Sequence, residues 1–237
     1  MLRARLGRRH RGIGGNALRA AVLGANDGLV SNFSLVMGVA GASAGGAPVL
    51  VAGLAGLLAG SLSMALGEWL SVQSARELYA NQIAIEAEKL AAFPAEEAEE
   101  LRKIYEAQGI DADDARRLAH RIVNGDPAVA LDTLCREALG IDPGELGGSA
   151  WVAAITSFGL FALGAAVPVS PFLVGAGLGA IVASAVLSGA ALFGLGAGIT
   201  VLTGQHPLGS GLRQLGFGLA AAAITFGLGT MLGSAIS

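Results

Sequence analysis

Two acidic residues and one methionine could together bind a metal ion in this chain. Asp27 lies in a short polar segment (residues 26–32), and Met64 and Glu68 lie four residues apart in a later apolar stretch. On a helix, that spacing places the thioether and the carboxylate on one side. A thioether beside carboxylates suits Fe(II) and related transition ions better than Mg(II) or Ca(II). The residue types therefore indicate a site for a divalent transition ion.

Each of these residues also has a simpler interpretation. Asp27 follows Arg19 by eight residues, so it could cap a helix or reach the membrane surface from a helix end. A methionine at helical spacing usually packs in a core, and for Met64 both interpretations stay open. For Asp27 we favour a functional role, because ionisable residues inside a membrane are functional by default and polar neighbours supply further oxygen atoms. These neighbours are Asn26, Ser31 and Asn32.

A second set of candidate ligands is a series of glutamates that follows the second apolar stretch. Glu97 and Glu100 share one face of a predicted helix, and Glu86 lies near the end of the helix before it. Carboxylates in this arrangement suit hard and borderline divalent cations. A run of charges is equally typical of a solvated helix face, and the sequence leaves that alternative open. The series comprises Glu77, Glu86, Glu88, Glu96, Glu97, Glu99, Glu100 and Glu106.

Motifs for other chemistry do not occur in the sequence. The three histidines are isolated, and His120 lacks an acidic partner at the spacing of di-iron helix bundles. There is no Walker loop, nucleophile elbow or paired Cys-x-x-Cys motif. The single cysteine, Cys135, excludes a disulfide framework. We therefore predict neither an enzyme nor a resident cofactor.

The stretches that hold Asp27 and Met64 are long enough to cross a membrane. The chain is 53% hydrophobic and only 14% charged, and residues 28–67 hold no charge at all. A transmembrane helix needs about 20 apolar residues, and turn residues at 45–48, 168–171 and 205–211 divide the apolar sequence into five helices. We predict an all-α membrane protein with five transmembrane helices. Spans one and two form a hairpin within residues 17–70, and residues 149–237 form spans three to five, near 149–168, 172–203 and 211–235.

Basic residues predict how the chain is oriented. Six arginines precede the first span and no acid occurs among the first 26 residues, so the positive-inside rule places the N-terminus in the cytoplasm. Five spans then place the C-terminus outside, and Arg213 falls on the inner side. We interpret residues 1–16 as a disordered basic arm. A secretory signal peptide is excluded, because the apolar region is too long, includes Asp27 and lacks an evident cleavage site.

An acidic helical module is predicted between spans two and three, on the cytoplasmic side. Residues 71–148 hold 16 acidic and 8 basic residues, a balance that suits cations as partners and argues against nucleic acid. The second span is expected to continue as one long helix until Pro94. Three short helices follow it, with boundaries set by proline, glycine and capping aspartates. They are expected at 95–108, at 112–123 and from Asp126-Pro127 to a point before Gly140.

The residues around Asp27 and Met64 resemble the vacuolar iron transporter family. The similar segments are 26–30 and 63–69, together with the glutamate-rich insertion, and the resemblance extends from Ala17 to Leu232. It implies a homodimer of five-span subunits, with the ion path between the two subunits, along their first two spans. It also implies export of Fe(II), often of Mn(II), from the cytoplasm in exchange for protons. Asp27 and Met64 match pathway ligands, and the module ligands of the family match Glu86, Glu97 and Glu100.

The chain departs from the family pattern in the module. Lys89 stands where plant members carry another module glutamate, and Leu134-Cys135 aligns with their pair of methionines. Ala138 stands where a further glutamate follows. We therefore expect fewer or looser metal sites in the module, while the pathway motif is intact.

A second departure lies in the pathway. A glutamate about two turns before Met64 in plant members aligns with Gly56 in this chain. We expect Glu68 to take over the role of that glutamate, because it lies on the same side of the helix as Met64. Asp27, Met64 and Glu68 are therefore the predicted pathway ligands.

These observations predict a proton-coupled exporter of Fe(II), and of Mn(II), in a lipid bilayer. Protons and metal ions would compete for the same carboxylates, which provides a simple basis for exchange. The composition, rich in Ala, Gly and Arg, suggests a bacterial cytoplasmic membrane. The alternative is a membrane-anchored metal-binding or regulatory protein that does not transport. A passive anchor has no reason to retain acids within its spans, and this favours the exporter.

Overall fold

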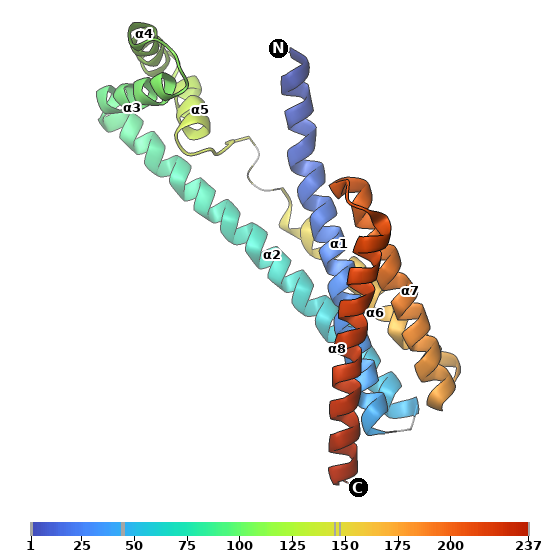
Figure 1. Ribbon diagram of the computed structural model, residues 1–237. Helices are drawn as coiled ribbons and strands as arrows, with labels where there is room; N and C mark the ends of the chain where they lie inside the picture. Colours follow the sequence, from blue (N-terminus) through green and yellow to red (C-terminus); the bar gives the residue numbers. More distant parts are fainter. Residues whose placement is uncertain (1, 44–45, 145, 147, 237) are drawn as a thin grey trace. The chain divides into compact units, whose positions relative to one another are not determined.

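The structure, a computed structural model, describes residues 2–43, 46–144, 146 and 148–236 (Figure 1). Its regular elements in these residues are all helices, in agreement with the predicted all-α fold. In chain order they are α1 (Leu2–Ala42), α2 (Gly46–Ala92), α3 (Pro94–Ala107), α4 (Ala112–Val123), α5 (Pro127–Glu137), α6 (Ala150–Val174), α7 (Gly177–Thr203) and α8 (Pro207–Ile236).

The chain divides into two compact units, which are described separately. Unit 1 comprises Met1–Glu68 and Ala153–Ser237, and unit 2 comprises Trp69–Val152. Helix α2 belongs to both, because it runs without interruption from Gly46 to Ala92. The prediction of one long helix ending before Pro94 is thereby confirmed.

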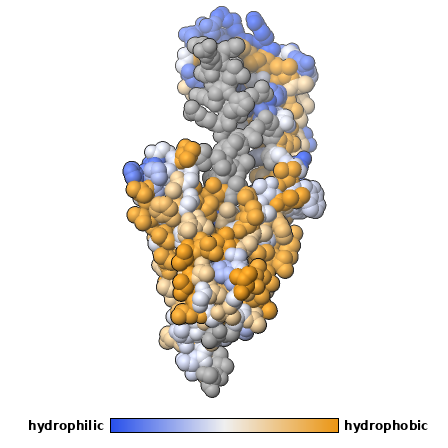
Figure 2. Space-filling model, turned by 90° about the vertical axis from the view of Figure 1, so that its right-hand side faces the viewer, coloured by the Kyte–Doolittle hydropathy of each residue, from blue (hydrophilic) through white to orange (hydrophobic). Residues whose placement is uncertain are grey.

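Four helices in the described part of the chain are long and apolar enough to cross a membrane. They are α2, α6, α7 and α8, and the face of the molecule shown in Figure 2 carries a broad area of apolar side chains. These features agree with a membrane protein. Helix α1 is not among the four, because its apolar residues are interrupted by Asn26, Asp27 and Asn32. Five spans therefore stay a prediction.

One side of helix α1 is buried in the core of unit 1, and this packing explains how that side can include a polar residue. Leu29, Phe33 and Val36 are fully buried and belong to the core cluster of the unit. The helix packs along α8 and α7. On this buried side α1 can carry a polar residue such as Asn32, which a lipid-facing side could not, whereas Asp27 lies on the exposed side of the helix.

Glycines bring α1 and α8 into close contact. A Cβ atom on Gly41 would lie 2.3 Å from the Phe226 carbonyl oxygen, and one on Gly229 would lie 1.9 Å from the Gly38 carbonyl oxygen. Such small residues let two helix backbones approach each other within a membrane. The Thr225 hydroxyl adds a hydrogen bond of 2.7 Å to the Ser34 carbonyl oxygen.

Two predictions about where helices begin and end were wrong. The turn expected at 168–171 does not exist, because Pro168 and Pro171 lie inside α6, which continues to Val174. A proline leaves the carbonyl four residues earlier without its helical partner. The Ser170 hydroxyl donates to the Val167 carbonyl oxygen at 2.8 Å and so satisfies the group that Pro171 leaves free. Residues 2–16, expected as a disordered arm, are helical and form the start of α1.

The predicted helices of unit 2 are confirmed, and capping side chains explain their ends. Asp111 accepts a hydrogen bond from the Asp113 amide at 3.0 Å, and Asp126 accepts one from the Ala128 amide at 2.9 Å. Gly140, just beyond α5, has a φ of 68°, a left-handed conformation that favours glycine. The helices enclose a small apolar core that includes Leu101, Ala119 and Leu134.

Candidate metal site

A cavity of about 370 Å³ in unit 1 brings together two of the predicted ligands, Asp27 and Met64. Its walls come from α1, α2 and α6. The lining residues are Asp27, Ser31, Asn32, Leu35, Gly56, Gly60, Ser63, Met64 and Phe161. Oxygen atoms and one thioether thus face the same space, which is the donor set expected for a borderline divalent ion.

The side of α2 that faces the cavity is built from residues four apart. Gly56, Gly60 and Met64 follow one another at this spacing, so they lie on one face of the helix. The Met64 side chain reaches α1, since a Cβ atom on Gly24 would lie 3.5 Å from its Cε atom and 3.7 Å from its Sδ atom. Gly24 is about one helical turn before Asp27. The small residues Gly56 and Gly60 leave room for the cavity, and Met64 lines it.

Phe161 of α6 forms another part of the wall and lies closely against two glycines. Its backbone meets α1 so closely that a Cβ atom on Gly28 would lie 2.2 Å from the Phe161 carbonyl oxygen. Its ring covers Gly60, where a Cβ atom would lie 2.3 Å from Cζ. The shape of the cavity therefore depends on glycine at both positions.

Asn32 is the most buried polar residue of the cavity, with 2% of its surface exposed. Its Nδ2 atom donates to the Gly53 carbonyl oxygen of α2 at 3.1 Å and to the Ala165 carbonyl oxygen of α6 at 2.8 Å. Its Oδ1 atom is buried without a hydrogen-bond partner. The sequence identified Asn32 only as a neighbour of Asp27. An asparagine within a long apolar run was the signal available.

Asp27 itself lies on a face of α1 that the chain leaves uncovered. The residues on this face are spaced four apart and are all exposed: Leu23, Asp27, Ser31 and Leu35. The Ser31 hydroxyl donates to the Asp27 backbone carbonyl oxygen at 2.5 Å, so it does not engage the carboxylate. Gln214 of α8 donates to Asn26 and thereby ties the segment next to Asp27 to α8.

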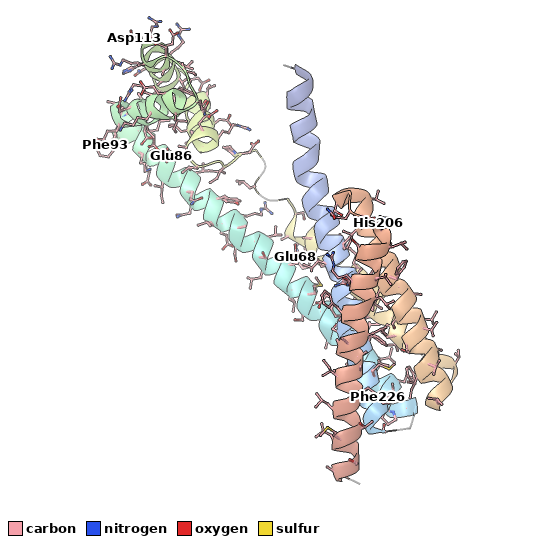
Figure 3. The ribbon with its side chains drawn as sticks, in the orientation of Figure 1. Glu68, Glu86, Phe93, Asp113, His206 and Phe226 are labelled. Carbon is pink, nitrogen blue, oxygen red and sulfur yellow. The ribbon has the colours of Figure 1, made fainter. Side chains whose placement is uncertain are left out.

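Glu68 is not brought into the cavity. It lies on α2 one turn beyond Met64 (Figure 3) and is partly exposed, but it does not line the space that Asp27 and Met64 share. Among the residues that the structure describes, no three histidine, cysteine, aspartate or glutamate side chains converge to hold a metal ion. One chain therefore contributes a single carboxylate to this cavity.

Two of the predicted ligands of the glutamate series, Glu86 and Glu97, lie next to each other in unit 2. Glu86 and Glu97 are almost fully buried, with 2% and 4% of their surfaces exposed, and each has one carboxylate oxygen without a hydrogen-bond partner. Glu100 is exposed, and its charge acts on Glu97. Burial, together with a hydrogen bond to Glu86 and the charges of Glu86 and Glu100, raises the pKa of Glu97 to about 7.

Lys89 supplies a positive charge to this group. Its Nζ atom lies 3.3 Å from a Glu86 carboxylate oxygen. Lys89 belongs to the last turn of α2, and Glu86 lies close to the same end of the helix (Figure 3). The hydrogen bond to Glu86 and the negative charges of Glu86, Glu97 and Glu100 raise the pKa of Lys89. A cavity of about 730 Å³ lies beside it, and its walls include Lys89, Glu97 and Glu100 but not Glu86. An ammonium group thus occupies a position where it competes with a metal ion for the same carboxylates.

Comparison with known proteins identifies the family. The family model described as "VIT family" matches residues 18–230, which is most of the chain. The chain belongs to the VIT family. Vacuolar iron transporter 1 of Arabidopsis thaliana is 33% identical over 216 residues, which cover 90% of this chain and 84% of the relative. The vacuolar iron transporter of Acanthamoeba castellanii is 34% identical over 235 residues, 94% of this chain and 82% of the relative.

The structure assigns packing roles to two residues that depart from the plant pattern of the VIT family. Leu134 and Cys135 are fully buried in unit 2. Burial is the main cause that raises the pKa of the Cys135 thiol, which disfavours the thiolate form that binds metal. Ala138 is the C-cap residue of α5 and has no donor side chain. In this VIT-family chain, these positions offer little to a metal ion.

Proposed function

We propose that this protein exports Fe(II), and Mn(II), from the cytoplasm in exchange for protons. Membership of the VIT family and the names of the relatives, vacuolar iron transporters, support the transport of metal ions across a membrane rather than catalysis. The observation that carries the proposal for this chain is the cavity between α1, α2 and α6. It places the Asp27 carboxylate and the Met64 thioether at one space within the apolar unit.

A homodimer completes the site in this proposal. Asp27 is exposed on its own chain, and an exposed carboxylate facing lipid would be strongly unfavourable. A second copy packed against the face of Leu23, Asp27, Ser31 and Leu35 would remove it from lipid. A two-fold axis would also bring two carboxylates and two thioethers to one path.

Proton coupling follows from the carboxylate chemistry of the path. A carboxylate that binds a metal ion must be deprotonated, so protons arriving from the outer side release the ion. In this proposal Asp27 alternates between the two cargoes. Glu68, one turn beyond Met64 on the side of unit 2, receives the ion before it enters the cavity.

The remaining parts of the chain provide access and orientation in this proposal. The bilayer contains five spans, formed by α1, the first part of α2, α6, α7 and α8, in a bacterial cytoplasmic membrane. The N-terminus and unit 2 face the cytoplasm, and the C-terminus lies outside. The carboxylates of Glu86, Glu97 and Glu100 attract divalent ions to the inner entrance, and Lys89 weakens that attraction.

The test is metal uptake by liposomes that contain the purified protein and a metal-quenched dye. Fe(II) is added under reducing conditions, with and without a pH gradient, to wild type and to the Asp27→Ala and Met64→Ala variants. We expect quenching that the gradient accelerates. Because these two side chains line the path, we expect Asp27→Ala to lower the rate at least about tenfold and Met64→Ala by several fold.

Two outcomes would contradict the proposal. Quenching that is no faster than in empty liposomes, together with metal binding by the folded protein, would favour a membrane-anchored metal-binding protein. Transport by Asp27→Ala and Met64→Ala at the wild-type rate would place the path elsewhere. Gly194→Ala is the matched control, since its added methyl group meets no atom within 4 Å.

A further inference from the structure

We propose that Trp69 and Trp151 form an aromatic anchor in the headgroup region of the lipid bilayer, on the side where unit 2 lies. Trp151 is the residue that contacts the lipid headgroups, and Trp69 supports it from the protein side. This inference goes beyond metal transport. It requires only that α2 and α6 cross a membrane, and it fixes where each of them leaves the hydrocarbon.

The two indole rings pack against each other within unit 2. Their centroids lie 6.1 Å apart and their planes meet at 60°, an edge-to-face arrangement that is favourable for aromatic pairs. They are the only two tryptophans of the chain, and they come from different helices, α2 and α6. The pair therefore joins the end of one apolar segment to the start of the next.

The two rings differ in what surrounds them. Trp151 exposes 68% of its surface, and Val152 and Ile155, which follow it on α6, are similarly exposed. Trp69 is only partly exposed, and its Nε1 atom is buried without a hydrogen-bond partner. An indole combines an apolar ring with a polar N–H donor, and such side chains concentrate where hydrocarbon meets headgroups. Trp151 is accessible enough to make both kinds of contact with lipid, whereas Trp69 faces the protein.

The lengths of α2 and α6 place both tryptophans one bilayer thickness from the other end of their helix. At about 1.5 Å per residue, α2 covers about 35 Å from Gly46 to Trp69, and α6 covers about 35 Å from Trp151 to Val174. The hydrocarbon core of a bilayer is about 30 Å thick. Each helix thus crosses the core once between its tryptophan and its far end, and both tryptophans fall just outside the core on one side.

Charged residues begin at the same level of α2. Residues 28–67 hold no charge, Glu68 is the first charged residue after them, and Arg76 is exposed about two turns beyond Trp69. Basic side chains near the end of a span reach the phosphates of the headgroups. The division of the chain agrees with this level, since unit 2 extends from Trp69 to Val152. Helix α2 continues without a break, so the tryptophan pair marks where it leaves the bilayer.

The anchor also sets the depth of the cavity in unit 1. Glu68, next to Trp69, lies at the edge of the hydrocarbon. Along α2, Met64 lies about 8 Å and Gly56 about 20 Å from Trp69, and both line the cavity. The cavity therefore extends from a point close to this surface to about the centre of the bilayer.

Intrinsic fluorescence tests the anchor, because the chain has no other tryptophan. Purified Trp69→Phe, which keeps Trp151, is reconstituted into liposomes whose lipids carry bromine either close to the ester group or near the end of the acyl chain. We expect the shallow bromines to quench Trp151 about twofold more strongly than the deep ones, since the ring lies at the headgroups. Wild type should show the same preference, which guards against an effect of the substitution itself. In Trp151→Phe, both lipids should quench Trp69 more weakly.

The matched control is Leu163→Trp in a chain that carries phenylalanine at both native tryptophan positions. Leu163 is as exposed as Trp151 and lies about 18 Å further along α6, near the centre of the bilayer, so deep bromines should quench this tryptophan more strongly. The same depth profile for Trp151 and for Leu163→Trp would overturn the inference. Absence of quenching of Trp151 by either lipid would also overturn it, and would show that protein, such as a second copy of the chain, covers Trp151.

Discussion

Glu97 shows how burial changes the chemistry of a single side chain. It lies on α3 with 4% of its surface exposed, next to the equally buried Glu86. Its pKa rises from 4.5 to about 7, mainly because burial disfavours the charged form. At neutral pH, Glu97 therefore carries a proton for part of the time, and a metal ion that binds there must displace it.

The raised pKa of Glu97 predicts that unit 2 loses stability as the pH rises. The folded state keeps a proton that the unfolded state has lost, so stability falls between pH 4.5 and about 7 and stays low above that range. The expected loss is roughly 1–3 kcal/mol. Hydrogen-exchange protection of the α3 amides, measured without metal at pH 5 and pH 8, would report it.

Two variants check this assignment. Glu97→Gln is neutral throughout, so it should lose much less protection between pH 5 and pH 8 than wild type. Glu99→Gln, on the exposed face of the same helix, should behave as wild type. Equal pH dependence in wild type and Glu97→Gln would show that another group is responsible.

At the scale of single residues, the sequence showed which side chains could bind a metal ion. It did not show how deeply each is buried or which groups it contacts. Asp27 could be selected because a carboxylate is unusual within an apolar stretch, and Met64 because it lies four residues before Glu68. The structure places Asp27 and Met64 at one cavity. The direction of the Asn32 amide depends on carbonyl groups far away in the sequence, at Gly53 and Ala165. The burial of Glu86 and Glu97 depends in the same way on tertiary packing, which spacing alone does not reveal.

At the scale of helices, two glycines allow α1 and α6 to cross in close contact. A Cβ atom on Gly28 would lie 2.2 Å from the Phe161 carbonyl oxygen, and one on Gly164 would lie 2.1 Å from the Ala25 carbonyl oxygen. Backbone atoms cannot rotate away as a flexible side chain can. The two helices must therefore separate if either glycine is replaced.

Gly28→Ala and Gly164→Ala should each lower the free energy of unfolding by about 1–3 kcal/mol, as overpacking of a tight contact does. Gly159→Ala on α6 is the matched control, because nothing lies within 4 Å of its added methyl group and alanine favours a helix. Thermal unfolding in detergent, followed by circular dichroism, measures the three. Equal stability of Gly28→Ala and Gly159→Ala would contradict the close crossing.

Helix ends could be predicted where a local signal determines them. Asp111, Asp126 and Pro94 mark helix starts in the sequence, and the structure has helices beginning next to each. Pro168 and Pro171 were expected to mark a turn between two helices, but both lie inside α6. In α6 the Val167 carbonyl group that Pro171 leaves free accepts a hydrogen bond from the Ser170 hydroxyl, and the helix continues through both prolines.

For the whole molecule, the five-span arrangement predicts which loops face which side. Ala47 and Ala176 would lie outside, and His206 would lie in the cytoplasm; all three are exposed residues. The native Cys135 is fully buried and its pKa is raised, so it should react slowly with maleimides. Single cysteines introduced at the three positions can therefore be labelled against a low background.

We expect a membrane-impermeant maleimide to label Ala47→Cys and Ala176→Cys in intact cells that carry the protein in the plasma membrane. His206→Cys should be labelled only after the cells are permeabilised, because it would lie on the inner side. Labelling of His206→Cys in intact cells would refute the arrangement. Labelling of all three would show that the chain crosses the membrane differently from the sequence-based topology.

In the proposed five-span arrangement, the polar residues of α1 also affect how the chain enters the bilayer during synthesis. An aspartate at the centre of a helix opposes insertion by about 2.5–3.5 kcal/mol, so α1 should enter together with the more apolar first part of α2. The packing of α1 is completed only after the later helices have been synthesised. The contacts at Ser34, Gly38 and Gly41 come from α8, the last 30-residue helix of the chain. A ribosome must therefore finish α8 before the helix that carries Asp27 is enclosed, and a truncation within α8 would leave α1 poorly retained, although α8 does not line the cavity.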